Sequence, residues 1–158
     1  MDFKKSQSFR CFKSVCLWSL FGILTVIACF FTGYILTCIA GLIKGSAFAQ
    51  GFGWIAIVFP TILLTLLLLL CFAIANGYLI FILYMEYVKK SNNLPLFVAE
   101  KTEAVFNRIV KSNVIKNIIS IISVVSFILN IFISAINFYI IIIALITFGI
   151  LLVIYKNK

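Results

Sequence analysis

The sequence of 158 residues contains no histidine and only four carboxylates. Without histidine, the chain lacks the usual general base, the usual activator of a nucleophile and the commonest metal ligand. The carboxylates are Asp2, Glu86, Glu100 and Glu103. None lies deep in a long apolar segment, where proton-coupled transporters place acidic relays. We therefore expect a protein that is not an enzyme and that binds no cofactor or metal ion.

Cysteine is present, but not in a metal-binding or redox pattern. The five residues include no C-x-x-C pair and lie at Cys11, Cys16, Cys29, Cys38 and Cys71. Because buried cysteine behaves as a small apolar residue, we expect that structural role here. A redox pair of Cys29 and Cys71, which fall at similar depths in their predicted helices, is the alternative.

Apolar residues, in contrast, dominate the sequence. They make up 65% of the chain, and charged residues make up only 11%, whereas a typical soluble domain has roughly 45–50% apolar residues. Three blocks carry no charge, at 15–43, 54–85 and 118–155. A transmembrane helix needs about 20 apolar residues, so each block is long enough to cross a bilayer.

The third block is too long for one crossing. At about 1.5 Å per residue, a single helix of this length would greatly exceed the hydrocarbon core of about 30 Å. We divide it into helices at 118–135 and 139–155 with a turn near Asn137, because asparagine is common in turns. The sequence thus predicts one domain, an all-α, polytopic integral membrane protein with four transmembrane helices in two hairpins.

Basic residues are distributed unevenly between the ends of these helices. Twelve lie in the leader 1–14, the segment 86–117 and the tail 156–158, whereas the loop 44–53 contains only Lys44. The positive-inside rule then places both termini in the cytoplasm. Because this asymmetry explains the net charge of +9, we expect binding to anionic lipid headgroups and not to nucleic acid. The candidate headgroup ligands are Lys89, Lys90, Arg108, Lys111 and Lys116.

The segment 86–117 also contains an amphipathic pattern. From Pro95 onward, apolar residues recur at helical spacing, and proline suits the first turn of a helix. We expect a cytoplasmic interfacial helix that lies on the inner membrane surface, with docking to a partner protein as the alternative. Its apolar residues are Val98, Val105, Phe106, Ile109 and Val114.

Small residues recur at every fourth position of the first crossing segment, 15–43. The series is Thr25, Cys29, Gly33, Thr37 and Gly41. Small residues at this spacing let two membrane helices approach closely. We therefore predict a specific helix–helix seam along this face, either within the chain or between copies of it.

Polar residues recur in register along the third crossing segment. They are Ser120, Ser123, Ser126, Asn130, Ser134 and Asn137. At about 100° per residue, all six fall within a stripe of about 120°. Because unpaired polar groups in hydrocarbon are costly, we expect the stripe to face another helix, with Asn76 as a hydrogen-bond partner for Asn130. The alternative is a polar strip that lines a pore.

Together these patterns predict a small non-enzymatic membrane protein that acts through helix packing. Its partner would be another membrane protein or a second copy, with the chain serving as an accessory, assembly or protective subunit. One alternative is a small oligomeric channel or transporter lined by the serine and asparagine stripe, and another is immunity against a membrane-inserting toxin.

The sequence AFA at 47–49 imitates a signal-peptide cleavage site. Because the apolar run before it exceeds the 7–15 residues of a signal peptide, we expect no cleavage.

Overall fold

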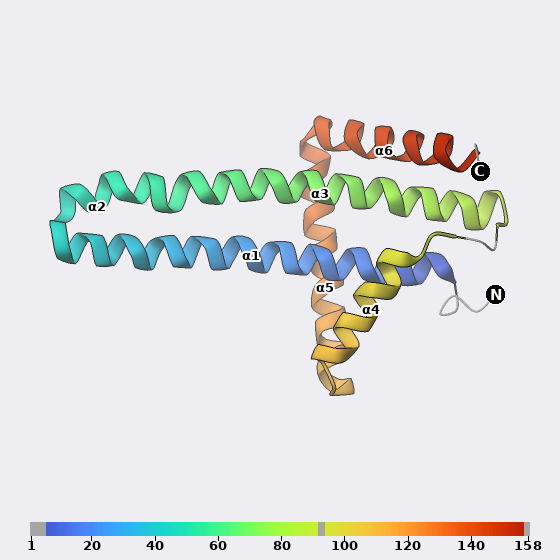
Figure 1. Ribbon diagram of the computed structural model, residues 1–158, viewed down its shortest axis with the longest axis horizontal. Coiled ribbons are helices and arrows are strands. Elements are labelled where there is room, and N and C mark those ends of the chain that lie inside the picture. Colours follow the sequence, from blue (N-terminus) through green and yellow to red (C-terminus); the bar gives the residue numbers. More distant parts are fainter. Residues whose placement is uncertain (1–5, 92–93, 157–158) are drawn as a thin grey trace. The chain divides into compact units, whose positions relative to one another are not determined.

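The computed structural model describes residues 6–91 and 94–156 (Figure 1). Within these residues all regular secondary structure is helical, which confirms the predicted all-α class. The elements are α1 (Gln7–Lys44), α2 (Ser46–Gly53), the π-helical turn η2 (Trp54–Val58), α3 (Phe59–Leu83), the π-helical turn η3 (Tyr84–Val88), α4 (Phe97–Ile109), α5 (Asn113–Ile136) and α6 (Phe138–Lys156).

Four helical stretches are long and apolar enough to cross a membrane, as the sequence predicts. They are Gln7–Lys44, Ser46–Val88, Asn113–Ile136 and Phe138–Lys156. The first begins at Gln7, well before the predicted start at residue 15. The segment 44–53, predicted to be a loop, is mostly helical, because a single residue turns the chain. This residue is Gly45, whose φ of +88° is open to glycine at little steric cost.

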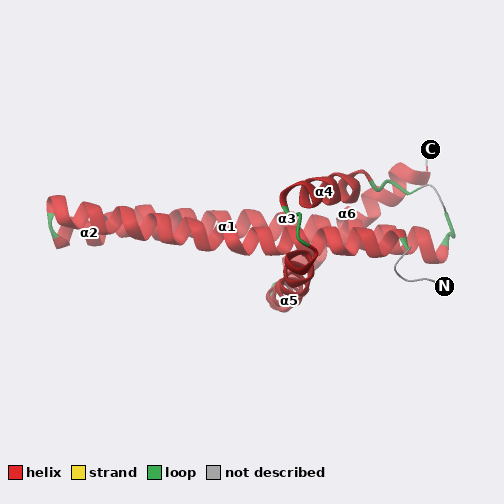
Figure 2. Cartoon of the chain, turned by 90° about the horizontal axis from the view of Figure 1, so that it is seen from below, coloured by secondary structure: helices red, strands yellow, loops and turns green. Residues whose placement is uncertain are grey.

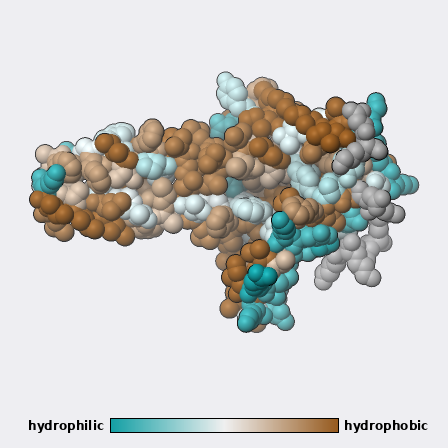
Figure 3. Space-filling view, in the orientation of Figure 1, coloured by the Kyte–Doolittle hydropathy of each residue, from teal (hydrophilic) through white to brown (hydrophobic). Residues whose placement is uncertain are grey.

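Two compact units make up the chain, and α1 and α3 each contribute to both. Unit 1 contains the described residues up to Leu20 and those from Leu70 onward, and unit 2 spans Phe21–Leu69. Unit 2 consists of two antiparallel helical segments joined at Gly45, and we call it the arm. Hydrophobic residues cover much of the visible face of the arm (Figure 3).

A π-helical turn precedes Pro60 in the arm. Proline has no N–H group, so Pro60 cannot donate a hydrogen bond to the carbonyl of Ala56. The preceding turn widens, and the N–H of Phe59 donates to the carbonyl of Trp54, five residues earlier. The wider turn lets the helix continue past the proline.

Unit 1 contains a packed core. Its largest fully buried hydrophobic side chains are Phe81, Ile82, Cys11 and Cys16. Phe127 of α5 joins the two long helices, because its ring packs edge-on against Phe12 of α1 and Phe72 of α3. The centroid separations are 5.2 Å and 5.8 Å. Segments from the N-terminal part and from the middle of the sequence therefore meet at α5.

Within unit 1, α5 runs crosswise to α1 and α3, as Figures 1 and 2 show. α6 then lies beside the second half of α3. Tyr155 packs against Phe81 and Phe148 against Tyr84, with ring centroids 5.3 Å and 5.8 Å apart. As a result, the first turn of α1, the end of α3 and the end of α6 lie at the same end of unit 1 (Figure 1).

The predicted second hairpin, formed by α5 and α6, is replaced by a corner. α5 ends at Ile136 and α6 begins at Phe138, so Asn137 alone connects them, with φ −106° and ψ 94°. An antiparallel helical hairpin uses a loop of about two to five residues. One extended residue is too short for that reversal, and it redirects the chain instead.

Candidate functional site

The first candidate site is the seam between the two halves of the arm, which we call the arm seam. Gly33 is buried there. A Cβ atom on Gly33 would lie 3.0 Å from the carbonyl carbon of Ala56 and 3.1 Å from Cα of Ile57. Further along, a Cβ atom on Gly41 would lie 3.2 Å from that of Ala49. Because backbone approaches backbone, a side chain at Gly33 would force the helices apart.

The remaining members of the small-residue series lie on the same side of α1. Thr25, Cys29 and Thr37 are half-buried. The hydroxyl of Thr37 donates to the carbonyl of Gly33 at 2.9 Å, and its methyl carbon lies 3.5 Å from a Cβ atom placed on Gly53. The series therefore lines a seam within a single chain.

A second close approach joins α3 to α6 in unit 1, at Gly77. A Cβ atom on Gly77 would lie 2.5 Å from the carbonyl oxygen of Ala144 and 2.7 Å from Cβ of Thr147. Sequence reasoning did not identify this contact. Ala73, which is fully buried, lies four residues before Gly77, and this pair of small residues is the signal that could have identified the contact.

The polar stripe of α5 faces the interior of unit 1 over part of its length. Ser123, Ser126 and Ser134 are buried, Ser120 and Asn130 are half-buried, and Asn137 is exposed. Asn137 lies in the connection between α5 and α6 and does not extend the stripe along the helix. The stripe as packed therefore consists of the five residues before it.

Asn130 forms the polar contact between α5 and α1. Its amide nitrogen donates a hydrogen bond to the hydroxyl of Ser19. The predicted bond to Asn76 is not formed, since the Asn76 amide donates to the carbonyl of Phe72, in its own helix, at 3.0 Å. The reason is the crosswise path of α5, which brings Asn130 to α1.

Three serine hydroxyls of the stripe donate hydrogen bonds within their own helix. Ser120 donates to the carbonyl of Lys116 at 2.8 Å and Ser134 to the carbonyl of Asn130 at 2.7 Å. Ser123 donates to the carbonyl of Ser120 at 2.8 Å. Such bonds satisfy a hydroxyl locally, so the stripe contributes small side chains for packing more than a polar surface.

Sequence reasoning missed a small-residue face on the first half of α1. Ser8, Ser14 and Ser19 are buried, with exposed fractions of 4%, 2% and 4%. Cys11 and Val15 are buried as well. Ser8, Cys11, Val15 and Ser19 are spaced by three or four residues, and this spacing is the signal that identifies the face.

Glu86, at the end of α3, binds the first turn of α1. Its carboxylate accepts hydrogen bonds from the Ser6 hydroxyl at 2.9 Å, the Gln7 N–H at 3.2 Å and the Ser8 N–H at 2.6 Å. The Ser8 hydroxyl donates to it too. A negative charge is stabilising at the N-terminus of a helix. This cap explains why α1 begins inside the predicted leader.

The pKa of Glu86 reflects two opposing effects. Partial burial alone would raise the pKa of this carboxyl, but the hydrogen bonds from Ser8, Ser6 and Gln7 outweigh it and lower the pKa. Glu86 follows the predicted crossing segment 54–85. The charged form of Glu86 therefore joins the ends of α1 and α3 just beyond that segment.

The predicted headgroup ligands lie mainly on the surface. Lys89, Lys90, Arg108 and Lys111 are exposed, and Lys116 is half-buried. Among the residues that the structure describes, the one ion pair is formed by Arg10 and Glu103, at 2.7 Å. The candidate headgroup ligands thus have no carboxylate partner in the described part of the chain.

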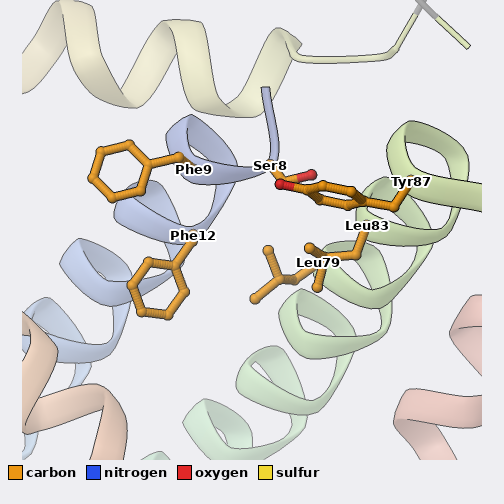
Figure 4. A pocket seen from close by; sticks show the side chains of 6 residues that line it. All are labelled: Ser8, Phe9, Phe12, Leu79, Leu83 and Tyr87. Atoms are coloured by element: carbon orange, nitrogen blue, oxygen red, sulfur yellow. The ribbon is translucent and has the colours of Figure 1, made fainter. Parts of the chain in front are cut away.

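An apolar cavity of about 330 Å³ lies between the first half of α1 and the second half of α3 (Figure 4). It is lined by Ser8, Phe9, Phe12, Leu79, Leu83 and Tyr87. Its walls suit an apolar group, but they lack the convergent polar groups that orient a substrate.

No disulfide bond links the five cysteines. All five are free thiols, Cys29 being half-buried and Cys71 exposed. Over residues 6–91 and 94–156, no three cysteine, aspartate or glutamate side chains lie close enough together to hold a metal ion.

No protein family, curated protein or solved structure matches this chain. The fold defines the class of the protein: an all-helical protein with four helices that are long and apolar enough to cross a membrane.

Proposed function

We propose that the protein is a multi-pass membrane protein that acts without catalysis, by packing against another membrane protein as an accessory, assembly or protective subunit. This proposal rests on the hydrogen bonds that polar side chains form within the long helices. Hydroxyls of these helices donate to carbonyls one turn earlier, at 2.7–2.8 Å; examples are Thr25, Thr32, Thr65 and Thr147. Side chains bonded in this way offer a partner shape more than reactive groups.

Both termini lie in the cytoplasm in this proposal. The asymmetry of lysine and arginine supports it. So does the position of the first turn of α1, the end of α3 and the end of α6 at one end of unit 1. α5 takes an oblique path to the start of α6, because it runs crosswise to the helices that it contacts.

The arm is the surface that we assign to the partner. Its apolar side chains are exposed on both helices, for example Phe31 at 58% and Leu66 at 60%. The contact at Gly33 holds these two helices together, so a partner helix would meet a preformed surface. Preorganisation of this kind lowers the entropic cost of association.

The two alternatives receive different support. A pore lined by the α5 stripe has less, because three of its serines are buried in unit 1 and two of those donate to carbonyls of their own helix. Immunity against a membrane-inserting toxin would use the same apolar surface of the arm, so the identity of the partner distinguishes it from an accessory role.

Purification from the native membrane in a mild detergent tests the proposal. A photoreactive amino acid at Ile35 or Leu66, both on the arm, should give an adduct with one other membrane protein, present in a fixed ratio to the chain. Leu129 is 52% exposed on α5 in unit 1 and provides the control position. Lipid adducts alone at the arm positions would overturn the accessory function, and an oligomer of this chain that conducts ions or solutes would favour the channel.

A further inference from the structure

α4 is an amphipathic helix that contacts the rest of unit 1 through its polar side. Ala99 is 1% exposed. Glu103 accepts a hydrogen bond from the guanidinium of Arg10 at 2.7 Å, and the indole N–H of Trp18 donates to the hydroxyl of Thr102 at 3.2 Å. A surface helix of a soluble domain buries its apolar stripe against the core. In α4 the side toward α1 instead contains alanine, threonine and glutamate, together with the half-buried ring of Phe106, over which Lys13 of α1 lies.

The aliphatic stripe of α4 is left exposed. Val98, Val105 and Ile109 have exposed fractions of 48%, 57% and 74%. At about 100° per residue, the three fall within a sector of about 40° around the helix. Ala99 and Glu103, which face unit 1, lie on average about 120° from the centre of that sector. Thr102, which accepts the hydrogen bond from Trp18, lies about 40° from the centre. The stripe therefore borders the contact with α1 on one side and is exposed on the other.

The charged residues of α4 are also distributed unevenly around the helix. Glu103 is engaged by α1, whereas Lys101 and Arg108 are exposed. These two cations lie about 60–80° from the stripe, on the side opposite the contact with α1, and the exposed Glu100 lies about 160° from it. In the described part of the chain neither cation has a carboxylate partner. The stripe thus has a cationic border, and hydrophilic residues gather over α4 in Figure 3.

Exposed aliphatic and basic side chains continue past the end of α4. Lys111 is exposed in the connection to α5. In the first turns of α5, Val114, Ile115 and Ile118 have exposed fractions of 67%, 51% and 51%. Aliphatic and basic side chains therefore alternate along two consecutive elements, in a pattern typical of helices that lie in a membrane interface.

We propose that the outer face of α4 binds an anionic bilayer surface, with Val98, Val105 and Ile109 in the acyl boundary and Lys101 and Arg108 at the headgroups. This inference rests on the proposed membrane function and adds to it the face and the class of lipid. A bilayer fits the face better than a protein does. Lys101 lies over the ring of the exposed Phe97, 4.2 Å from its centroid, and neither Lys101 nor Arg108 has a carboxylate partner in the described part of the chain. Basic residues beside an exposed apolar stripe attract anionic lipids.

Photocrosslinking in defined lipids tests the face. The full chain is reconstituted into nanodiscs of phosphatidylcholine alone or of phosphatidylcholine with phosphatidylglycerol, with a photoreactive amino acid at Val105 or at Glu100. The Val105 position should give lipid adducts in which phosphatidylglycerol exceeds its share of the bilayer. The Glu100 position, on the far side of α4, should give at least fivefold fewer adducts. Equal yields from both positions, or an adduct with a second copy at Val105, would overturn the proposal.

Charge reversal tests the lipid class. Lys101→Glu combined with Arg108→Glu should reduce the excess of phosphatidylglycerol among the Val105 adducts several-fold, with helix content by circular dichroism unchanged. Lys44→Glu, which reverses an exposed lysine of the arm, is the matched control and should leave the excess intact. If the double variant retains the excess, α4 is not an anionic-lipid site. These nanodiscs contain no other protein, so absence of a partner in the native membrane would leave this result unaffected.

Discussion

Unit 1 and the arm use the same apolar residue types in different ways. Phe81 and Ile82, in the part of α3 that belongs to unit 1, are fully buried. Ile62 and Leu66, in the part that belongs to the arm, are 55% and 60% exposed. A helix that stays apolar all round while burying little is typical of a lipid-facing segment. Neighbouring elements, and not composition, thus decide which residues of α3 meet protein.

The largest expected effect comes from removing a ring in the core of unit 1. Phe127→Ala leaves a cavity between Phe12 and Phe72, and we expect a loss of about 3–5 kcal/mol in the free energy of unfolding. Phe31→Ala, at an exposed position of the arm, should reduce the free energy of unfolding by much less than Phe127→Ala does. Unfolding of the purified protein in mixed detergent measures both. Similar losses from the two variants would remove the distinction between the units.

The next effect concerns the arm seam. Gly33→Leu would push α1 away from the backbone of Ala56, and overpacking of this kind costs about 1–3 kcal/mol or more. Distances between spin labels on the two halves of the arm should increase. Gly149→Ala is the control, since a Cβ atom there meets nothing within 4 Å. An unchanged distance distribution in Gly33→Leu would contradict the seam.

A smaller effect is expected where Glu86 caps α1. Glu86→Ala should free the first turn of α1 at a cost of about 1–2 kcal/mol. Hydrogen exchange of residues 7–12 should then become faster, while exchange within α6 stays the same. If the first turn keeps its protection, Glu86 is not the cap.

The lowered pKa of Glu86 also predicts that acid weakens this cap. The pKa of Glu86 is lowered in the folded protein, so its contribution is complete above the ordinary carboxyl pKa of about 4.3. This stabilising contribution is lost as the pH falls through the lowered pKa of Glu86. Protection of the first turn of α1 should therefore be constant at neutral pH and decrease only in acid, and the Glu86→Ala variant should lack that acid step.

The smallest effect is expected for the hydrogen bond between Asn130 of α5 and Ser19 of α1. Asn130→Leu removes the hydrogen bond to Ser19, and hydrogen bonds between membrane helices contribute about 0.6–2 kcal/mol. Combining it with Ser19→Ala in a double-mutant cycle isolates the coupling. Additive losses would show that the two side chains act independently.

The sequence predicts the helices better than it predicts their contacts. Uncharged runs longer than a bilayer crossing identify all four apolar helices, and four-residue spacing identifies the small-residue face around Gly33. The start of α1 could not be predicted, because its cap comes from Glu86, almost 80 residues away along the chain. The crosswise path of α5 was missed because it depends on the single connecting residue, Asn137.

The contacts that α4 makes with α1 were equally beyond the sequence. Its amphipathic pattern is plain, but periodicity identifies two faces without saying which one meets the protein. The contacts of Glu103 with Arg10 and of Thr102 with Trp18 decide that question. Both pair residues that are more than 80 positions apart.

The most direct test of the account is the environment of the arm relative to that of unit 1. Nitroxide-bearing amino acids at Leu66 and at Ser123, in the full chain reconstituted into lipid, would report collisions with oxygen and with a water-soluble nickel complex. We predict high oxygen and low nickel accessibility at Leu66, and low accessibility to both reagents at Ser123, which is 1% exposed. High nickel accessibility at Leu66 would place the arm in water and contradict the account.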